Sequence, residues 1–295
     1  MSPLIFAILA GICWALMGLC YKLADHRRCR PIPFAVSFLL VAAAAAAFLL
    51  PGEKTTWNAP TLWLIAGAVG LVTFADIALL TRANALGPAS IAWTMLNLGL
   101  LVPTLLAPVF FHESLHLVDG MLLALFLLML VSFARSMATA GETRAEHALA
   151  FGLCVVGVFI LEGLYLLGGK VKFHLYGDAN SAGYTVITYL VGAVLAWGAH
   201  RFNRNYSPPS GTEWLVGALA GITSSAGSLL LLAAMKLPAI VVYPITMGIA
   251  LLGGVTLTMV IFKERLNIYK TVGLVLGVIV LLMATLRDPL IAWFK

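Results

Sequence analysis

Long apolar runs follow one another along the chain, and short polar segments separate them. Each run has roughly 18 to 25 residues, which is enough for a helix to cross a hydrocarbon core about 30 Å thick. The ten runs are Leu4–Leu23, Pro33–Leu50, Leu62–Ala83, Ala89–Phe111, Leu115–Met137, Ala148–Gly169, Ala182–His200, Trp214–Met235, Ala239–Phe262 and Asn267–Leu286. The pattern predicts an all-α integral membrane protein with ten transmembrane helices.

Two of the predicted connections are very tight, at Gly87-Pro88 and Leu237-Pro238. A residue that precedes proline is disfavoured in the helical region, so each dipeptide indicates a break between spans and not one long helix. The longest connection, Arg201–Glu213, is too short to hold a soluble domain.

Composition supports the membrane prediction. Of the 295 residues, 62% are hydrophobic and 10% are charged, and the mean hydropathy is +1.02. Soluble domains carry about 25% charged residues. The net charge of +6 comes from basic residues in the short connections, which is typical of an orientation signal and not of nucleic-acid binding.

The N-terminal residues and the cysteines do not change the prediction of a multi-span membrane protein. No basic segment precedes the first apolar run, so we expect a retained first helix and not a cleaved signal peptide. The four cysteines have no CxxC spacing, and we expect neither a disulfide framework nor a metal site. They are Cys13, Cys20, Cys29 and Cys154.

The two halves of the sequence resemble each other. Residues 86–93, Leu-Gly-Pro-Ala-Ser-Ile-Ala-Trp, match 237–243, Leu-Pro-Ala-Ile-Val-Val-Tyr, and residues 111–115, Phe-His-Glu-Ser-Leu, match 262–266, Phe-Lys-Glu-Arg-Leu, at an offset of 150 to 151 residues. The matches predict a duplication with units 1–140 and 148–290. Because five helices per unit is an odd number, the second unit must insert the opposite way. Such inverted repeats are typical of secondary transporters.

Residues 11–18, Gly-Ile-Cys-Trp-Ala-Leu-Met-Gly, and the turns Glu113-Ser114-Leu115 and Glu264-Arg265-Leu266 carry a resemblance to a known family. The chain resembles the EamA branch of the drug/metabolite transporter superfamily. It differs from the family pattern in having His112 and Lys263 where glycine is usual and alanine after the tryptophan of the first helix.

The resemblance implies two inverted five-helix repeats that move a small metabolite by alternating access. It also implies a central cavity lined by the first, third, fourth, sixth, eighth and ninth helices.

The distribution of Lys and Arg predicts the orientation. The odd-numbered connections hold twelve of the 18, and the termini and even-numbered connections hold six. This bias places both termini outside the cytoplasm, whereas the resemblance implies cytoplasmic termini.

Two charged residues fall well inside the predicted spans, Asp76 and Glu162. Carboxylates within a membrane are costly and normally face a cavity or a partner. They are candidates for binding a cationic group or for carrying a coupled proton, because burial favours the protonated carboxyl. The alternative is a structural hydrogen-bond anchor. Thr73 and Tyr165 lie one turn away and are candidate donors to them, and Tyr165 is also a candidate substrate contact.

Aromatic and amide residues at helical spacing form a second candidate set. Trp14 shares a helix face with Gly18 and Tyr21, and Trp93 shares one with Asn97. Tyr243 is the repeat counterpart of Trp93. We expect Trp14, Trp93, Asn97 and Tyr243 to contact substrate; the alternative is the aromatic belt at the membrane interface. Trp57, Trp63, Trp214 and Trp293 lie at span ends and fit the belt.

Small residues and prolines within the predicted spans are candidates for helix packing, substrate contact or bending of the helices. Ser224, Ser225 and Ser228 suit helix packing or substrate contact, and the pairs Gly217/Gly221 and Gly273/Gly277 suit packing within the chain or between protomers. Proline frees a backbone carbonyl and bends a helix. The hinge candidates are Pro103, Pro108 and Pro244.

No catalytic, cofactor or metal site is predicted. A phosphate-binding loop is absent, and His112-Glu113-Ser114-Leu115-His116 matches the zinc motif in letters only, because we expect it in a connection and not on a helix.

The sequence therefore predicts a multi-pass secondary transporter, by our hypothesis proton-coupled, in a bacterial inner (plasma) membrane. Its substrate is expected to be an amino acid or a related metabolite, with amines or quaternary ammonium compounds as the alternative. The expected partners are this solute and membrane lipids, without nucleic acid, and the protein is a monomer or homodimer. An intramembrane enzyme or a channel is the alternative of another class.

Overall fold

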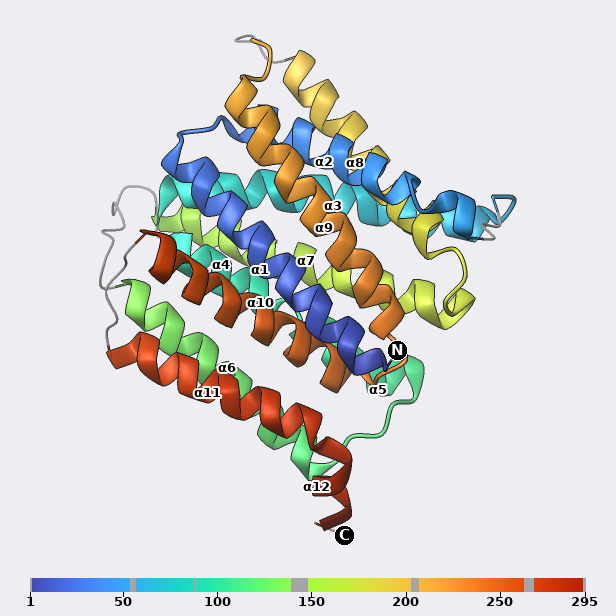
Figure 1. Cartoon of the computed structure of the whole chain (residues 1–295), viewed down its shortest axis with the longest axis vertical. Coiled ribbons are helices and arrows are strands. Elements are labelled where there is room, and N and C mark those ends of the chain that lie inside the picture. The colour runs from blue at the N-terminus through green and yellow to red at the C-terminus, as the bar shows by residue number, and fades with distance from the viewer. Residues whose placement is uncertain are drawn as a thin grey trace.

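The computed structural model describes residues 2–53, 57–87, 89–138, 148–202, 207–262 and 268–293. Within these ranges every regular element is helical (Figure 1). The elements are α1 Pro3–His26, α2 Pro31–Ala47, a 3₁₀ turn η1 Leu50–Gly52, α3 Pro60–Leu86, α4 Ala89–Leu98, α5 Leu101–Phe111, α6 Leu117–Ala138, α7 Ala148–Tyr176, α8 Ser181–Arg201, α9 Gly211–Ala234, α10 Ala239–Phe262, α11 Ile268–Thr285 and α12 Arg287–Trp293.

The helix starts follow from local sequence. Prolines open α1, α2 and α3, where a missing N–H costs no hydrogen bond. A capping box opens α9: the Glu213 N–H donates to the Ser210 hydroxyl at 3.2 Å, and the Ser210 N–H donates to the Glu213 carboxylate at 2.6 Å.

Six helices of the described chain are long and apolar enough to cross a membrane, and the pair α11–α12, bent by 73°, brings this number to seven if it counts as one span. Three further apolar helical stretches are shorter: Pro31–Ala47, Met95–Phe111, which covers the end of α4 and all of α5, and Leu117–Ser132. These lengths confirm the coarse prediction of an all-α, multi-span membrane protein. The count of ten spans stays a prediction.

The expected span Ala89–Phe111 is two helices instead of one. Pro103 explains the break, because it has no N–H for the Gly99 carbonyl four residues earlier and its ring crowds that carbonyl. Gly99 O instead accepts from the Val102 N–H at 3.0 Å, a tighter turn than an α-helix makes. Pro108 and Pro244 leave α5 and α10 continuous.

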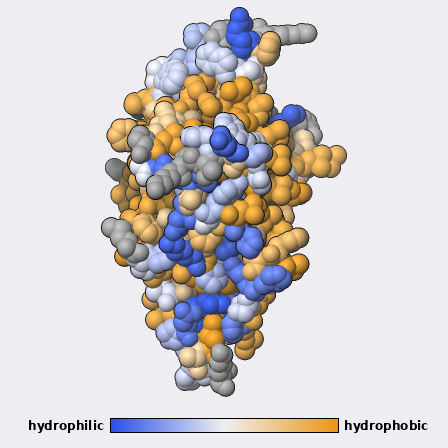
Figure 2. All heavy atoms as spheres, turned by 90° about the vertical axis from the view of Figure 1, so that its right-hand side faces the viewer, coloured by the Kyte–Doolittle hydropathy of each residue, from blue (hydrophilic) through white to orange (hydrophobic). Residues whose placement is uncertain are grey.

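Helices from the two halves pack against each other. α1 lies along α9 and α10, α2 lies against α8 and α9, α3 lies against α7 and α8, and α6 pairs with α11 (Figure 1). Both chain ends lie toward the same end of the bundle. Seen from that end, hydrophilic side chains gather in a band down the middle, and hydrophobic side chains cover both flanks (Figure 2). This distribution fits a bundle whose flanks face lipid.

Glycine permits close approach of α2 and α9. A Cβ added at Gly217 would lie 3.0 Å from the Phe34 carbonyl oxygen, and one at Gly221 would overlap that of Phe38. The pair Gly217/Gly221 therefore packs within the chain.

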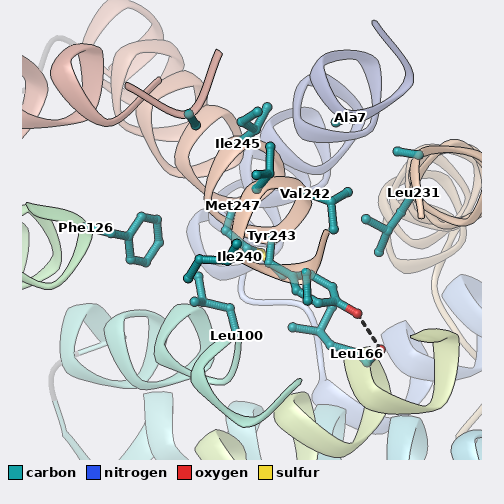
Figure 3. Close-up of a cluster of buried hydrophobic side chains, with 14 of the residues drawn as sticks. Ala7, Leu100, Phe126, Leu166, Leu231, Ile240, Val242, Tyr243, Ile245 and Met247 are labelled. Atoms are coloured by element: carbon teal, nitrogen blue, oxygen red, sulfur yellow. Dashed lines mark hydrogen bonds between the residues drawn. The ribbon is translucent and has the colours of Figure 1, made fainter. Parts of the chain in front are cut away.

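The largest apolar cluster surrounds the N-terminal half of α10 (Figure 3). Ile240, Val242 and Tyr243 meet Leu100 from the α4–α5 turn and Phe126 from α6. The Tyr243 hydroxyl donates a hydrogen bond of 2.9 Å to the Leu166 carbonyl of α7. This cluster joins α10 to helices of the first half.

We expect Gly221→Ala to destabilise the protein by about 2 kcal/mol, because the added methyl overlaps the Phe38 carbonyl and forces α2 and α9 apart. Thermal unfolding in detergent measures the effect. Gly67→Ala is the matched control, since a Cβ there meets nothing within 4 Å. Equal unfolding temperatures for the two variants would contradict the packing described above.

Candidate functional site: a central cavity

A cavity of about 320 Å³ lies among α1, α2, α3, α4, α7, α8, α9 and α10. Lys22 and Asp25, at the C-terminal end of α1, line it and are exposed. The cavity therefore reaches solvent at the end of the bundle opposite the two chain termini. This end holds the connection between α1 and α2.

Both carboxyl groups predicted inside the spans line this cavity. Asp76 of α3 is 7% exposed, and its Oδ1 has no hydrogen-bond partner in the described part of the chain. Glu162 of α7 is partly buried and lies against the α4–α5 break, where a Cβ added at Gly99 would come within 2.9 Å of its side chain. The two carboxyl groups thus line one cavity, from α3 and from α7.

The expected donors to these carboxyl groups are engaged elsewhere, which corrects the sequence prediction. The Thr73 hydroxyl donates to the Val69 carbonyl at 2.8 Å, as threonines inside helices commonly do. The Tyr165 hydroxyl pairs with the Ser228 hydroxyl at 2.7 Å. A structural anchor would have satisfied hydrogen bonds, so this arrangement does not support the anchor interpretation of Asp76.

Four hydroxyl groups form a network beneath the cavity. Tyr189 of α8 pairs with Ser224 and with Ser228 at 2.8 Å each, and Tyr165 of α7 joins through Ser228. Beyond this network lies a second cavity of only about 20 Å³, lined by Leu231 and other residues of α7, α8 and α9. The network therefore separates the large cavity from the small one.

Aromatic rings surround the large cavity. The Tyr21 ring meets the edge of Trp93 at a centroid distance of 5.3 Å and that of Phe34 at 5.2 Å. Trp14, 7% exposed, packs against Gly227 of α9. Asn97 is buried, and its amide donates to the Trp93 carbonyl at 2.8 Å.

Six of the seven predicted substrate contacts meet in this cavity, and they come from α1, α3, α4 and α7. They are Trp14, Asp76, Trp93, Asn97, Glu162 and Tyr165. The structure places the seventh, Tyr243, outside it. Its side chain is fully buried in the apolar cluster of Figure 3.

Sequence reasoning missed Asn84, Phe38 and Tyr189 as lining residues. Asn84 lies two turns after Asp76 on one face of α3, so helical spacing could have found it. Phe38 and Tyr189 bring α2 and α8 into the lining, in addition to the six helices implied by the resemblance.

The far end of the bundle is closed by contacts between the halves. Glu113, after α5, accepts from the Ala239 N–H at 2.7 Å and so caps the N-terminus of α10. Its other oxygen lies 2.5 Å from the Lys170 ammonium of α7, whose side chain is 7% exposed. An exposed pair, Lys236 with Asp178, lies near this end at 2.6 Å.

The structure also bears on two predictions outside the cavity lining, those for the zinc-like motif and for Ser225. His112–His116 lie in the connection between α5 and α6, so the zinc-like letters do not share a helix face. Among the residues that the structure describes, no group of three His, Cys, Asp or Glu side chains could hold a metal ion. The Ser225 hydroxyl is buried and has no hydrogen-bond partner among the described residues.

We expect Gly18→Phe to block solute binding without unfolding the protein. Gly18 lines the cavity, and a Cβ there meets nothing within 4 Å, so a phenyl ring has room only in the cavity itself. Loss of ligand-induced thermal stabilisation measures the block. Gly67→Phe on α3 lies outside the lining and serves as control; a block in both variants would argue against the cavity as the site.

Comparisons with known proteins bear on the fold alone. No family model and no curated protein matches the chain. Twenty-eight chains of solved structures match. One of them, a crystal structure, aligns with 95% of this chain and 98% of its own at a TM-score of 0.69 and 18% sequence identity. At this identity the similarity shows that the helical architecture is shared along nearly the whole chain.

Proposed function

We propose that the protein is a secondary transporter that moves a small solute across a membrane by alternating access. The observation that carries the proposal is the central cavity of about 320 Å³, which reaches solvent at one end of the bundle and is closed at the other. A site between two halves, open to one side at a time, is what this mechanism requires.

The packing of the helices supports an inverted repeat. α1 packs on α9 and α10, and its counterpart α7 packs on α3 and on α4–α5; likewise α2 packs on α9, and α8 on α3. The pairs α2–α8 and α6–α11 match each helix with its own counterpart. If each helix is replaced by its counterpart in the other half, the same helix pairs are again in contact. This agreement supports ten helices in two five-helix units and membership of the EamA-like transporters.

The positions of Trp93 and Tyr243 fit this mechanism. In the two units they occupy matching places near the starts of α4 and α10. Trp93 borders the open cavity, whereas Tyr243 is buried and bonded to Leu166 at the closed end. In the opposite state Tyr243 would line a cavity and Trp93 would be buried, and Pro103, Pro108 and Pro244 are the hinges proposed for this change.

The cavity mouth lies on the side of the connections rich in Lys and Arg. We therefore propose that this state faces the cytoplasm and that both termini lie outside. The proposed location is a bacterial inner membrane, where the protein acts as a monomer or homodimer. The closed far end argues against a continuous pore and therefore against a channel.

We expect saturable counterflow of at least one small solute in proteoliposomes. An alternating-access carrier exchanges labelled external solute against unlabelled internal solute without net flux, whereas a channel does not accumulate label in this way. Thermal shifts of the purified protein with a panel of amino acids, amines and related metabolites select the solutes. Unitary currents in a planar bilayer would overturn the carrier proposal.

We expect Glu113→Gln to open the closed end. The substitution leaves the buried Lys170 ammonium without its partner, at a cost of about 3 kcal/mol or more in the closed state. The rate at which an impermeant maleimide labels Tyr243→Cys, in a background whose four native cysteines are replaced, should rise at least tenfold.

Asp178→Asn is the matched control for this experiment. It breaks the pair with Lys236, whose side chain is 52% exposed, and such surface pairs contribute little. Labelling rates that respond equally to both substitutions, or to neither, would show that the buried pair does not hold this end closed.

A further inference from the structure

The charge of the cavity lining is acidic away from its mouth. The described lining residues include three acidic side chains and one basic side chain, Lys22, which is exposed at the end of α1 next to Asp25. Deeper in the cavity only Asp76 and Glu162 carry ionisable acid groups. Apart from Lys22, the described lining contains no basic side chain.

Every element of the lining contributes residues to the cavity that holds these two carboxyls. They are Tyr21, Lys22 and Asp25 on α1; Phe38 on α2; Thr73 and Asn84 on α3; Trp93 and Asn97 on α4; Tyr165 on α7; Tyr189 on α8; Ser224 on α9; and on α10 only the apolar Met247, Ala250, Leu251, Gly254 and Val255. Tyr165, Tyr189 and Ser224 belong to the hydroxyl network, and Asn97 donates to a backbone carbonyl.

Besides the charge of the lining, the carboxyl group of Asp76 itself points to a ligand. It is more than nine-tenths buried, it lines the cavity, and its Oδ1 has no partner in the described part of the chain. A lone buried carboxylate costs several kcal/mol, so the group requires either a proton or a cation beside it. The cavity has room for a cation, and the only basic side chain of its described lining is Lys22, exposed at the mouth.

Aromatic faces complete the chemistry of the site. Trp14, Tyr21 and Trp93 line the cavity near the carboxyl groups, and aromatic faces attract ammonium groups that have left water. A volume of about 320 Å³ suits a ligand of one ring with a short side chain.

We propose that the solute carried by this cavity is an organic monocation with an aromatic body, which binds Asp76 and Glu162 in exchange for one proton. This inference rests on the proposed transport function. The zwitterion of an amino acid fits less well, because its carboxylate would face two acid groups, and the only basic group of the described lining lies at the mouth.

The exchange balances in charge and atoms. Without solute, the two acid groups of this cavity are expected to hold at least one proton, because two carboxylates that line one small cavity without a counter-ion repel each other in a medium of low dielectric constant. An entering ammonium forms an ion pair with the carboxylate, and the displaced proton leaves to the solvent. One positive charge enters and one leaves.

Four probes that share one phenyl ring test the head group: 2-phenylethylammonium, 2-phenylethanol, phenylacetate and phenylalanine. We expect 2-phenylethylammonium to bind the purified protein at least tenfold more tightly than each of the others by calorimetry. Tighter binding of phenylalanine, phenylacetate or the alcohol would overturn the inference, as would no binding of the ammonium. Counterflow of any solute would in those cases leave the transport function standing.

The proton is tested with phenyltrimethylammonium, whose charge does not vary with pH. Its affinity should fall about tenfold for each unit by which pH is lowered in the range where the acid pair holds the proton. In weak buffer about one proton should be released for each cation bound. A flat pH profile without proton release would overturn the exchange.

Substitutions of Asp76 and Glu162 test whether these two carboxyl groups bind the proton and the cation. Asp76→Asn and Glu162→Gln should each weaken binding of phenyltrimethylammonium at least tenfold, and the double substitution should abolish its pH dependence. Asp178→Asn at the closed end is the control and should leave both unchanged. If the ammonium binds tightly but no solute shows counterflow, the cation site stands and the transport function fails.

Discussion

A carboxyl group inside an apolar helical bundle is the constraint on which the arrangement of this protein depends. Asp76 lies on α3, and the same helix presses Gly70 against α8 so closely that a Cβ there would lie 2.8 Å from the Val191 side chain. Because that face is filled, the face with Asp76 is left toward the space between the halves. The bundle therefore places the carboxyl group beside a cavity, and Oδ1 has no partner in the described part of the chain.

The two ends of the bundle differ although similar elements meet at each. At the closed end, Glu113 both pairs with Lys170 and caps α10, so one side chain ties α7 and α10 to the connection after α5. Tyr243 adds a hydrogen bond from α10 to α7. At the open end the matching aromatic, Trp93, contacts Tyr21 and borders the cavity. Glu113 links the two halves, whereas the hydrogen bond of Tyr243 and the ring contact of Trp93 each lie within one half. A small number of contacts thus distinguishes the two ends of the bundle.

The helices were predictable because lipid forces long apolar runs, and Asp76 and Glu162 stood out because charge is rare inside them. Helical spacing also grouped Trp14 with Tyr21 and Trp93 with Asn97. The break at Gly99 was not predictable from proline alone, since Pro244 leaves α10 continuous. Whether a helix breaks depends on how its neighbours satisfy the freed carbonyl, and a single sequence does not contain this information.

The environment of Tyr243 shows a second limit of prediction from the sequence. Its match to Trp93 in the repeat predicted equal surroundings, but any state open at one end treats the two halves differently. In the proposed transport cycle, symmetry in the sequence would describe both states together, while one structure shows a single state. Likewise, Thr73 had two acceptors within reach, the Val69 carbonyl and the Asp76 carboxyl, and only the packed structure decides between them.

The hydroxyl network of Tyr165, Tyr189, Ser224 and Ser228 lies where the two cavities meet, and its chemistry suits that place. Each hydroxyl can both donate and accept, so the partners on α7, α8 and α9 can exchange hydrogen bonds as helices shift without leaving a buried group unpaired. A fixed ion pair would not allow this at low cost, because breaking it leaves a buried charge. Tyr165 follows Glu162 by one turn of α7, so the network is linked through that helix to the acid pair. The bundle thus places its costly, specific contact at the closed end and its adaptable contacts at the centre, beside the cavity.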